Sequence, residues 1–218
     1  MSGLLMKDLG LIKINMKTYL AVFLIGLIYL ITQENGSTFF VAYATFVSIG
    51  VSVGTISYDG YHHGMKFLMT LPVTKKQYVQ SKYLLSFCFA VLVSVVSLVL
   101  GMIRIQISGK QEIEDLLISA GVALVISGII LCGMIPLRLK YEAEKSRIVM
   151  VAAVAVIFLV VAACKKLYDV YQESLGKGLQ FLDTLSGWQI AIALLVIMVV
   201  CLAVSVKVSE RIMEKKEF

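Results

Sequence analysis

Six long stretches of this chain contain no Asp, Glu, Lys, Arg or His, and they constrain the fold more than any other feature of the sequence. A bilayer core about 30 Å thick is crossed by roughly 20 apolar residues in an α-helix. The stretches are continuous rather than alternating, which favours helices over the strands of a β-barrel. The sequence therefore predicts an all-α integral membrane protein with one transmembrane domain over residues 1–218. The six predicted spans are residues 18–33, 37–57, 83–103, 116–137, 148–164 and 188–206.

The composition supports this class and excludes several functions. Hydrophobic residues make up 59% of the chain and charged residues only 16%, against about 45–50% and 25% in an ordinary soluble domain. Ion-coupled transporters and intramembrane enzymes carry ionisable residues within the bilayer, and these six spans contain none. No Gly-Lys pair has the glycine spacing of a phosphate-binding loop. Energy for any uphill transport would therefore come from another chain. The four cysteines, without short spacing, are interpreted as small hydrophobes.

Lysine and arginine predict the orientation. If the N-terminus is cytoplasmic, fifteen of these residues lie in the inner segments and five in the outer ones. Positive residues favour the cytoplasmic side of a membrane protein. We therefore expect a multi-pass protein of the bacterial cytoplasmic membrane with both termini in the cytoplasm. The net charge of +6 is largely this topology signal, and it indicates no nucleic-acid partner.

Residues 1–17 precede the first span and have a helical pattern of their own. Leu5, Leu9, Ile12 and Met16 recur at helical spacing, with charged residues elsewhere on the wheel. This pattern predicts an amphipathic helix on the inner membrane surface. An early start of the first span is the alternative.

The segment SYDGYHHGMKFLMTLPVTKKQY, between spans two and three, is predicted to be a cytoplasmic elbow of two helices. A short helix from His62 is expected to end near Leu71, since Pro72 disfavours the α conformation in the residue before it. A second helix then begins at Thr74, which forms a capping box with Gln77, and continues into span three.

The chemistry of this loop leaves several interpretations open. Asp59 and His62 are spaced to share a metal ion, but adjacent histidines point about 100° apart on a helix and no third ligand is in view. A solvated polar face is the ordinary alternative. A mixture of aromatic, histidine and methionine residues favours a protein-contact surface. In span two, Gly50 and Gly54 form a GxxxG pair, which fits either a dimer interface or packing within one subunit.

Two loops carry a resemblance to a known family. The run LPVTKKQYVQSKYLL (71–85) and the run IPLRLKYEAEKSR (135–147) resemble the cytoplasmic loops of small type-two ABC exporter permeases. These permeases are the six-span membrane subunits of bacterial ATP-binding cassette exporters. Within this group the chain is most similar to permeases of the phenol-soluble modulin exporter kind, which expel amphipathic peptides.

The resemblance implies a mechanism and partners. Two permease subunits, as a homodimer or heterodimer, would pair with two ATPase subunits that bind ATP and Mg²⁺, while this chain would bind no cofactor. The helix between spans two and three would be the coupling helix. Residues 165–187 would supply re-entrant helices. The residues implied to contact the ATPase are Tyr58, Asp59, His62, His63, Lys66, Phe67, Met69, Lys140, Tyr141, Glu142, Glu144 and Lys145.

The predicted function is therefore that of a permease subunit, not itself an enzyme, which forms the pathway for amphipathic or hydrophobic peptides across the bilayer. A membrane sensor or immunity protein that binds peptide or lipid without moving it is the alternative.

Overall fold

The computed structural model of the chain describes residues 2–33, 35–60, 64–108, 113–141 and 187–216. All regular secondary structure within these residues is helical, as the sequence predicts. The helices are α1 (Ser2–Ile14), α2 (Met16–Thr32), α3 (Gly36–Gly60), α4 (Gly64–Thr70), α5 (Lys75–Ser108), α6 (Ile113–Lys140) and α9 (Gly187–Glu214).

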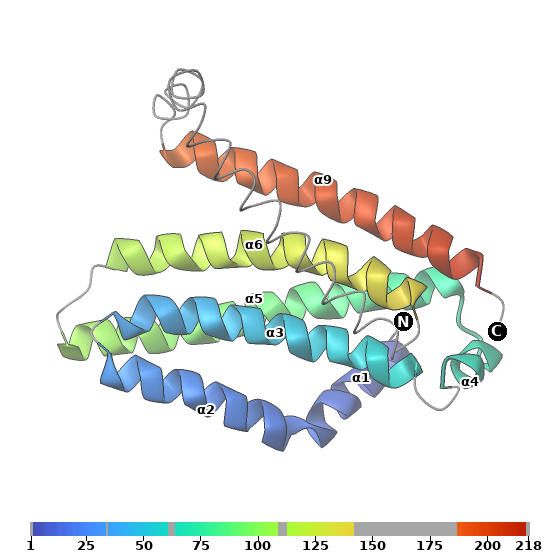
Figure 1. Cartoon of the computed structure of the whole chain (residues 1–218), viewed down its shortest axis with the longest axis horizontal. Helices are drawn as coiled ribbons and strands as arrows, with labels where there is room; N and C mark the ends of the chain where they lie inside the picture. The colour runs from blue at the N-terminus through green and yellow to red at the C-terminus, as the bar shows by residue number, and fades with distance from the viewer. Residues whose placement is uncertain (1, 34, 61–63, 109–112, 142–186, 217–218) are drawn as a thin grey trace, which may run out of the picture.

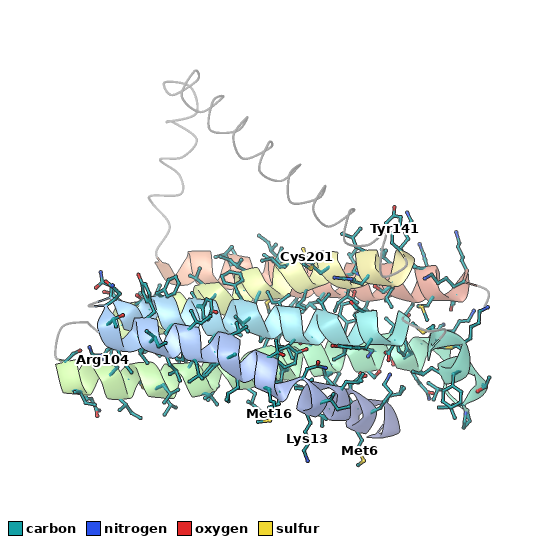
Figure 2. All side chains as sticks on the ribbon, turned by 60° about the horizontal axis from the view of Figure 1, so that its bottom comes forward. Met6, Lys13, Met16, Arg104, Tyr141 and Cys201 are labelled. Carbon is teal, nitrogen blue, oxygen red and sulfur yellow. The ribbon has the colours of Figure 1, made fainter. Side chains whose placement is uncertain are left out.

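The long helices run side by side in an elongated bundle around α3 (Figure 1). Helix α3 packs against α2, α5 and α6, and α9 packs against α5 and α6. Helices α1 and α4, the end of α6 and the end of α9 gather at one end, here called the basic end (Figure 1, right). Arg104 lies at the opposite end from Tyr141 (Figure 2). This arrangement agrees with the prediction that these segments share one side of the membrane.

Four of the helices are long and apolar enough to cross a membrane, namely α3, α5, α6 and residues Ala193–Glu214 of α9. A fifth crossing is possible if α1 and α2 form one span that bends by 66° between them. These helices match the predicted spans at 18–33, 37–57, 83–103, 116–137 and 188–206. The predicted span at 148–164 and nearly all of the predicted re-entrant segment lie outside the described residues.

The N-terminal segment is a separate helix rather than a straight start to α2, because of the 66° bend. Asn15 lies at the bend, and its Oδ1 accepts a hydrogen bond from the hydroxyl of Tyr58 at 3.0 Å. The side of α1 that faces the bundle carries the buried residues Leu4 and Asp8. Of the predicted apolar stripe, Leu9 on α1 and Met16 at the start of α2 are exposed, while Leu5 and Ile12 are partly buried.

The buried face of α3 is lined by hydroxyl residues, which satisfy their own hydrogen bonds. Thr45, Ser48, Ser52 and Thr55 recur at helical spacing and are all buried. Each hydroxyl donates to a carbonyl three or four residues earlier in the same helix, at 2.6 to 3.0 Å. Buried polar groups cost free energy unless they are bonded, so these local bonds allow α3 to occupy the centre of the bundle.

Helix α6 continues through Pro136 to Lys140, although the resemblance places residues 135–147 in a loop. Proline has no N–H, so the carbonyl of Cys132 loses its ordinary partner four residues on. Ser205 of α9 replaces that partner, since its hydroxyl donates to the Cys132 carbonyl at 2.5 Å. Tyr83 of α5 bonds to Ser205 at 2.5 Å and to Ser209 at 2.9 Å. This chain of hydroxyls fills the gap at the proline and joins α5, α6 and α9.

Candidate coupling surface

The short helix α4 forms where the sequence predicts the first arm of the elbow. It ends at Thr70, whose hydroxyl donates to the carbonyl of Phe67 at 2.7 Å. The residue before a proline is displaced from the α region, and the chain leaves the helix at Leu71 and Pro72. The elbow is therefore set by local sequence.

The second arm begins with the predicted capping box. The backbone N–H of Gln77 donates to Oγ1 of Thr74, and the backbone N–H of Thr74 donates to Oε1 of Gln77, both at 3.2 Å. This reciprocal pair satisfies two donors that a helix N-terminus otherwise leaves open. Helix α5 then runs without a break from Lys75 to Ser108, so the elbow continues directly into a long helix.

Helix α4 has an inner and an outer face. Leu68 is buried in the main hydrophobic core, and Met65 and Met69 pack against the same core. On the outer face, Phe67 is 71% exposed, with Lys66 and Thr70 also exposed. An aromatic side chain held outward by a helix whose other face is anchored is well placed to enter a pocket of another protein.

The start of α5 is also fixed to the end of α9. Lys75 Nζ donates to the backbone carbonyls of Glu214 and Lys216 at 3.3 and 2.6 Å. Lys76 pairs with the Glu214 carboxylate at 3.4 Å. Cations near a helix C-terminus are favourable because the last carbonyls carry partial negative charge. The elbow is thus connected to α9 as well as to α3 and α5.

Behind the elbow lies an ion-pair cluster formed by Lys7, Asp8, Asp59 and Lys82. Lys82 is 1% exposed, and its Nζ donates to both carboxylate oxygens of Asp8 at 2.7 Å. The same ammonium lies 2.8 Å from Oδ2 of Asp59. Lys7 Nζ completes the cluster, at 2.5 Å from Oδ1 of Asp59 and 3.3 Å from Oδ1 of Asp8.

Two neutral side chains bond to this cluster. The hydroxyl of Tyr78 donates to Oδ2 of Asp59 at 2.9 Å, and Lys82 Nζ donates to Oγ1 of Thr55 at 3.3 Å. The four charges cancel, and every carboxylate oxygen has a donor. A buried charge is tolerated only with such pairing. The cluster therefore connects α1, α3 and α5 directly behind the elbow.

A family comparison agrees with this architecture. The family profile described as ABC-2 family transporter protein matches residues 3–214, nearly the whole chain. The chain belongs to the ABC-2 transporter family. A search of curated proteins gives no match. The protein is therefore a multi-pass permease component, and such components carry no ATPase activity of their own and generally pair with an ABC ATPase.

Seven of the residues predicted to contact the ATPase lie within the described residues of the permease. Lys66, Phe67 and Lys140 are exposed at the basic end, as is Tyr58, which is 44% exposed. Tyr141 is half-buried, with Lys140 Nζ 5.3 Å from its ring centroid. Met69 and Asp59 lie behind the surface, Met69 against the core and Asp59 in the ion-pair cluster. The other five, His62, His63, Glu142, Glu144 and Lys145, lie outside the described residues.

The metal interpretation of this loop receives no geometric support from the residues described. Both carboxylate oxygens of Asp59 are already bonded, to Lys7, Lys82 and Tyr78. Within the described ranges, no three His, Cys, Asp or Glu residues are grouped as a metal site requires.

The two glycines of the GxxxG pair in α3 have different surroundings. A Cβ on Gly54 would lie 3.4 Å from the hydroxyl of Tyr19, so Gly54 packs against α2 of the same subunit. A Cβ on Gly50 would meet no described atom within 4 Å, and Gly50 is exposed. Packing within one subunit therefore accounts for Gly54, and Gly50 is the one open to an outside partner.

The ion-pair cluster is the feature that sequence reasoning missed. Because the predicted spans contain no charged residue, they leave Lys82 and Asp59 outside the helical bundle. One signal was present, because Asp8 is the only acidic residue before the first span and Asp59 the only one between spans two and three. A single carboxylate in each of two basic segments suggests pairing rather than solvation.

Proposed function

We propose that this permease forms the translocation pathway of an exporter of amphipathic or hydrophobic peptides, driven by two copies of a separate ATPase. A second permease subunit, identical or related, would complete the pathway. The basic end faces the cytoplasm of a bacterium in this proposal, because it carries most of the lysine and arginine. Phenol-soluble modulin-like peptides are the substrates that the sequence resemblance favours.

One observation carries the coupling part of the proposal, namely the exposure of Phe67 on an anchored helix. Phe67 is 71% exposed while its neighbour Leu68 is only 6% exposed. The outer face of α4 is thus presented to a partner and its inner face is part of the core. Closure of the ATPase dimer would push α4, and the continuous α5 together with the ion-pair cluster would carry the movement to α1 and α3.

The contact is tested by co-purification and by affinity. Phe67→Ala should weaken binding of the purified ATPase about 30-fold, since an aromatic hot spot contributes about 2 kcal/mol. Met6→Ala is the matched control, because Met6 is 74% exposed at the same end but lies on α1. Equal binding by the Phe67→Ala variant and the wild type would remove α4 from the contact.

The substrate class is tested in liposomes that contain permease and ATPase. Amphipathic helical peptides should raise ATP hydrolysis and accumulate across the bilayer, whereas scrambled peptides of the same composition should do neither. Tight peptide binding with unchanged hydrolysis would instead support the sensor or immunity alternative.

A further inference from the structure

A groove of about 260 Å³ opens on the side of the bundle near the bend between α1 and α2. Its walls are α2 and α5, and its floor is α3. Leu20 and Phe23 line it from α2, Val47 and Val51 from α3, and Phe89 and Val93 from α5. The lining is almost entirely apolar, so the groove favours an apolar occupant from the surrounding bilayer.

The mouth of this groove at the basic end is positively charged. Lys13 and Lys17 stand on either side of the bend, next in sequence to the lining residues Ile12 and Met16, and both lysines are exposed. Figure 2 shows Lys13 and Met16 projecting from the same side of the bend. Among the described residues neither lysine forms an ion pair, because the carboxylates of Asp8 and Asp59 are buried in the ion-pair cluster. An anion is therefore the complementary group at this mouth.

The size of the groove restricts its occupant. An α-helix with its side chains is about 10–12 Å across, so a 10 Å length of helix fills on the order of 1,000 Å³. The groove, at about 260 Å³, is smaller than such a length of helix, so a helix could lie across its mouth but could not be contained in it. A single methylene chain is thin enough to enter it. An occupant with one such chain and an anionic head matches both the shape and the charge.

We propose that this groove is a binding site for one acyl chain of an anionic phospholipid, whose phosphate lies between Lys13 and Lys17. The membrane location that the site requires follows from the family, and the inner leaflet follows from the proposed orientation. The site does not depend on which substrate is exported. Because the groove is lined from α1, α2, α3 and α5, the lipid would contact all four helices.

Native mass spectrometry of the full-length chain in detergent tests the site, with phosphatidylglycerol and phosphatidylcholine of identical acyl chains as probes. Phosphatidylglycerol should bind about 30-fold more tightly than phosphatidylcholine, because each of the two lysines near the phosphate contributes about 1 kcal/mol. Lys13→Gln with Lys17→Gln should reduce this preference to near unity. Lys207→Gln with Lys215→Gln is the matched control, since both lysines are exposed near the same end, Lys207 on α9 and Lys215 directly after it, and it should leave the preference unchanged.

A second variant tests the groove itself. Val47→Trp should fill the space and weaken both lipids, while the exposed lysine variants report on the head group without changing the core. Equal binding of the two lipids to the wild type, or an equal loss in the control pair, would overturn the proposal. Unchanged phosphatidylglycerol binding in Val47→Trp would also overturn it, by showing attraction to surface charge alone. Displacement of the lipid by an amphipathic peptide or by a second subunit would assign the groove to that occupant instead.

Discussion

The bond from Ser205 to the Cys132 carbonyl gives a sharp test of how α6 tolerates its proline. If Ser205 serves chiefly to replace the missing N–H of Pro136, its importance should depend on that proline. Ser205→Ala should destabilise the wild-type chain. The same substitution should have little effect in a Pro136→Ala background, where the new alanine supplies an ordinary N–H to the Cys132 carbonyl.

The magnitude follows from the bonds that change. In Ser205→Ala, Tyr83 loses one hydroxyl partner at 2.5 Å but keeps Ser209 at 2.9 Å. The Cys132 carbonyl loses the bond that replaces its helical one. An unsatisfied buried acceptor costs about 1–3 kcal/mol, and interhelical hydrogen bonds in membranes contribute about 0.6 and up to 1.7 kcal/mol. We expect a loss of about 1–1.5 kcal/mol in the wild type and below about 0.5 kcal/mol with Pro136→Ala.

The assay is a double-mutant cycle on the free energy of unfolding, measured by titration with a denaturing detergent in mixed micelles. Amide hydrogen exchange over the last turns of α6 gives a local readout, which should rise in Ser205→Ala and fall again in the double variant. Ser97→Ala is the matched control. Ser97 is also buried, but its hydroxyl bonds at 2.9 Å to the carbonyl of Ser94 within its own helix.

The reasoning would be refuted by equal destabilisation from Ser205→Ala in both backgrounds. That result would mean that Ser205 acts through packing or through Tyr83 alone. A cycle with Ser97→Ala and Pro136→Ala should show no coupling, and coupling there would show that Pro136→Ala disturbs the bundle as a whole.

Three further predictions test other parts of the structure. Lys82→Met should destabilise the chain by about 3–5 kcal/mol, because two buried carboxylates then share Lys7. Adding Asp8→Leu should recover part of this loss in an unfolding titration. A larger loss in the double variant would contradict the described pairing. Gly36→Ala should lower the unfolding temperature, since a Cβ there would lie 2.8 Å from the backbone carbonyl oxygens of Tyr29 and Leu30, while Gly50→Ala, open within 4 Å, should leave it unchanged or raise it. Arg104→Gln removes donors to the carbonyls of Leu30 and Ile31 at 3.2 and 2.9 Å, so amide exchange at the end of α2 should increase several-fold, for a loss of about 1 kcal/mol, with no change at the basic end.

Local sequence was sufficient to predict the positions of the helices and the elbow. Long uncharged runs located five described helices, because a bilayer about 30 Å thick requires roughly 20 apolar residues in each span, although α5 and α6 extend beyond their predicted ends. Pro72 and the capping box of Thr74 and Gln77 fixed the elbow, since both act over a few residues. These features depend on neighbours along the chain, and the sequence displays such neighbours directly.

Contacts between distant segments could not be predicted in the same way. Asp8 pairs with Lys82 across 74 residues, and Ser205 reaches Cys132 across 73. The continuation of α6 past Pro136 also depends on such a contact. Likewise, the inward side of α1 is decided by Asp8, whose burial is favourable only because Lys82 lies opposite. Without the fold, a charged residue is expected to be solvated.

The hydroxyl-lined face of α3 has a consequence for how the protein is made. Helix α3 is the most buried of the four candidate spans and also the least apolar. During synthesis, each helix is tested by the insertion machinery for its preference for lipid, before later helices exist to cover it. Thr45, Ser48, Ser52 and Thr55 reduce that preference only modestly, because each bonds to its own backbone. Helix α3 is therefore suited to insert into the bilayer before α5 and α6 are made. The later helices would then pack around it during synthesis.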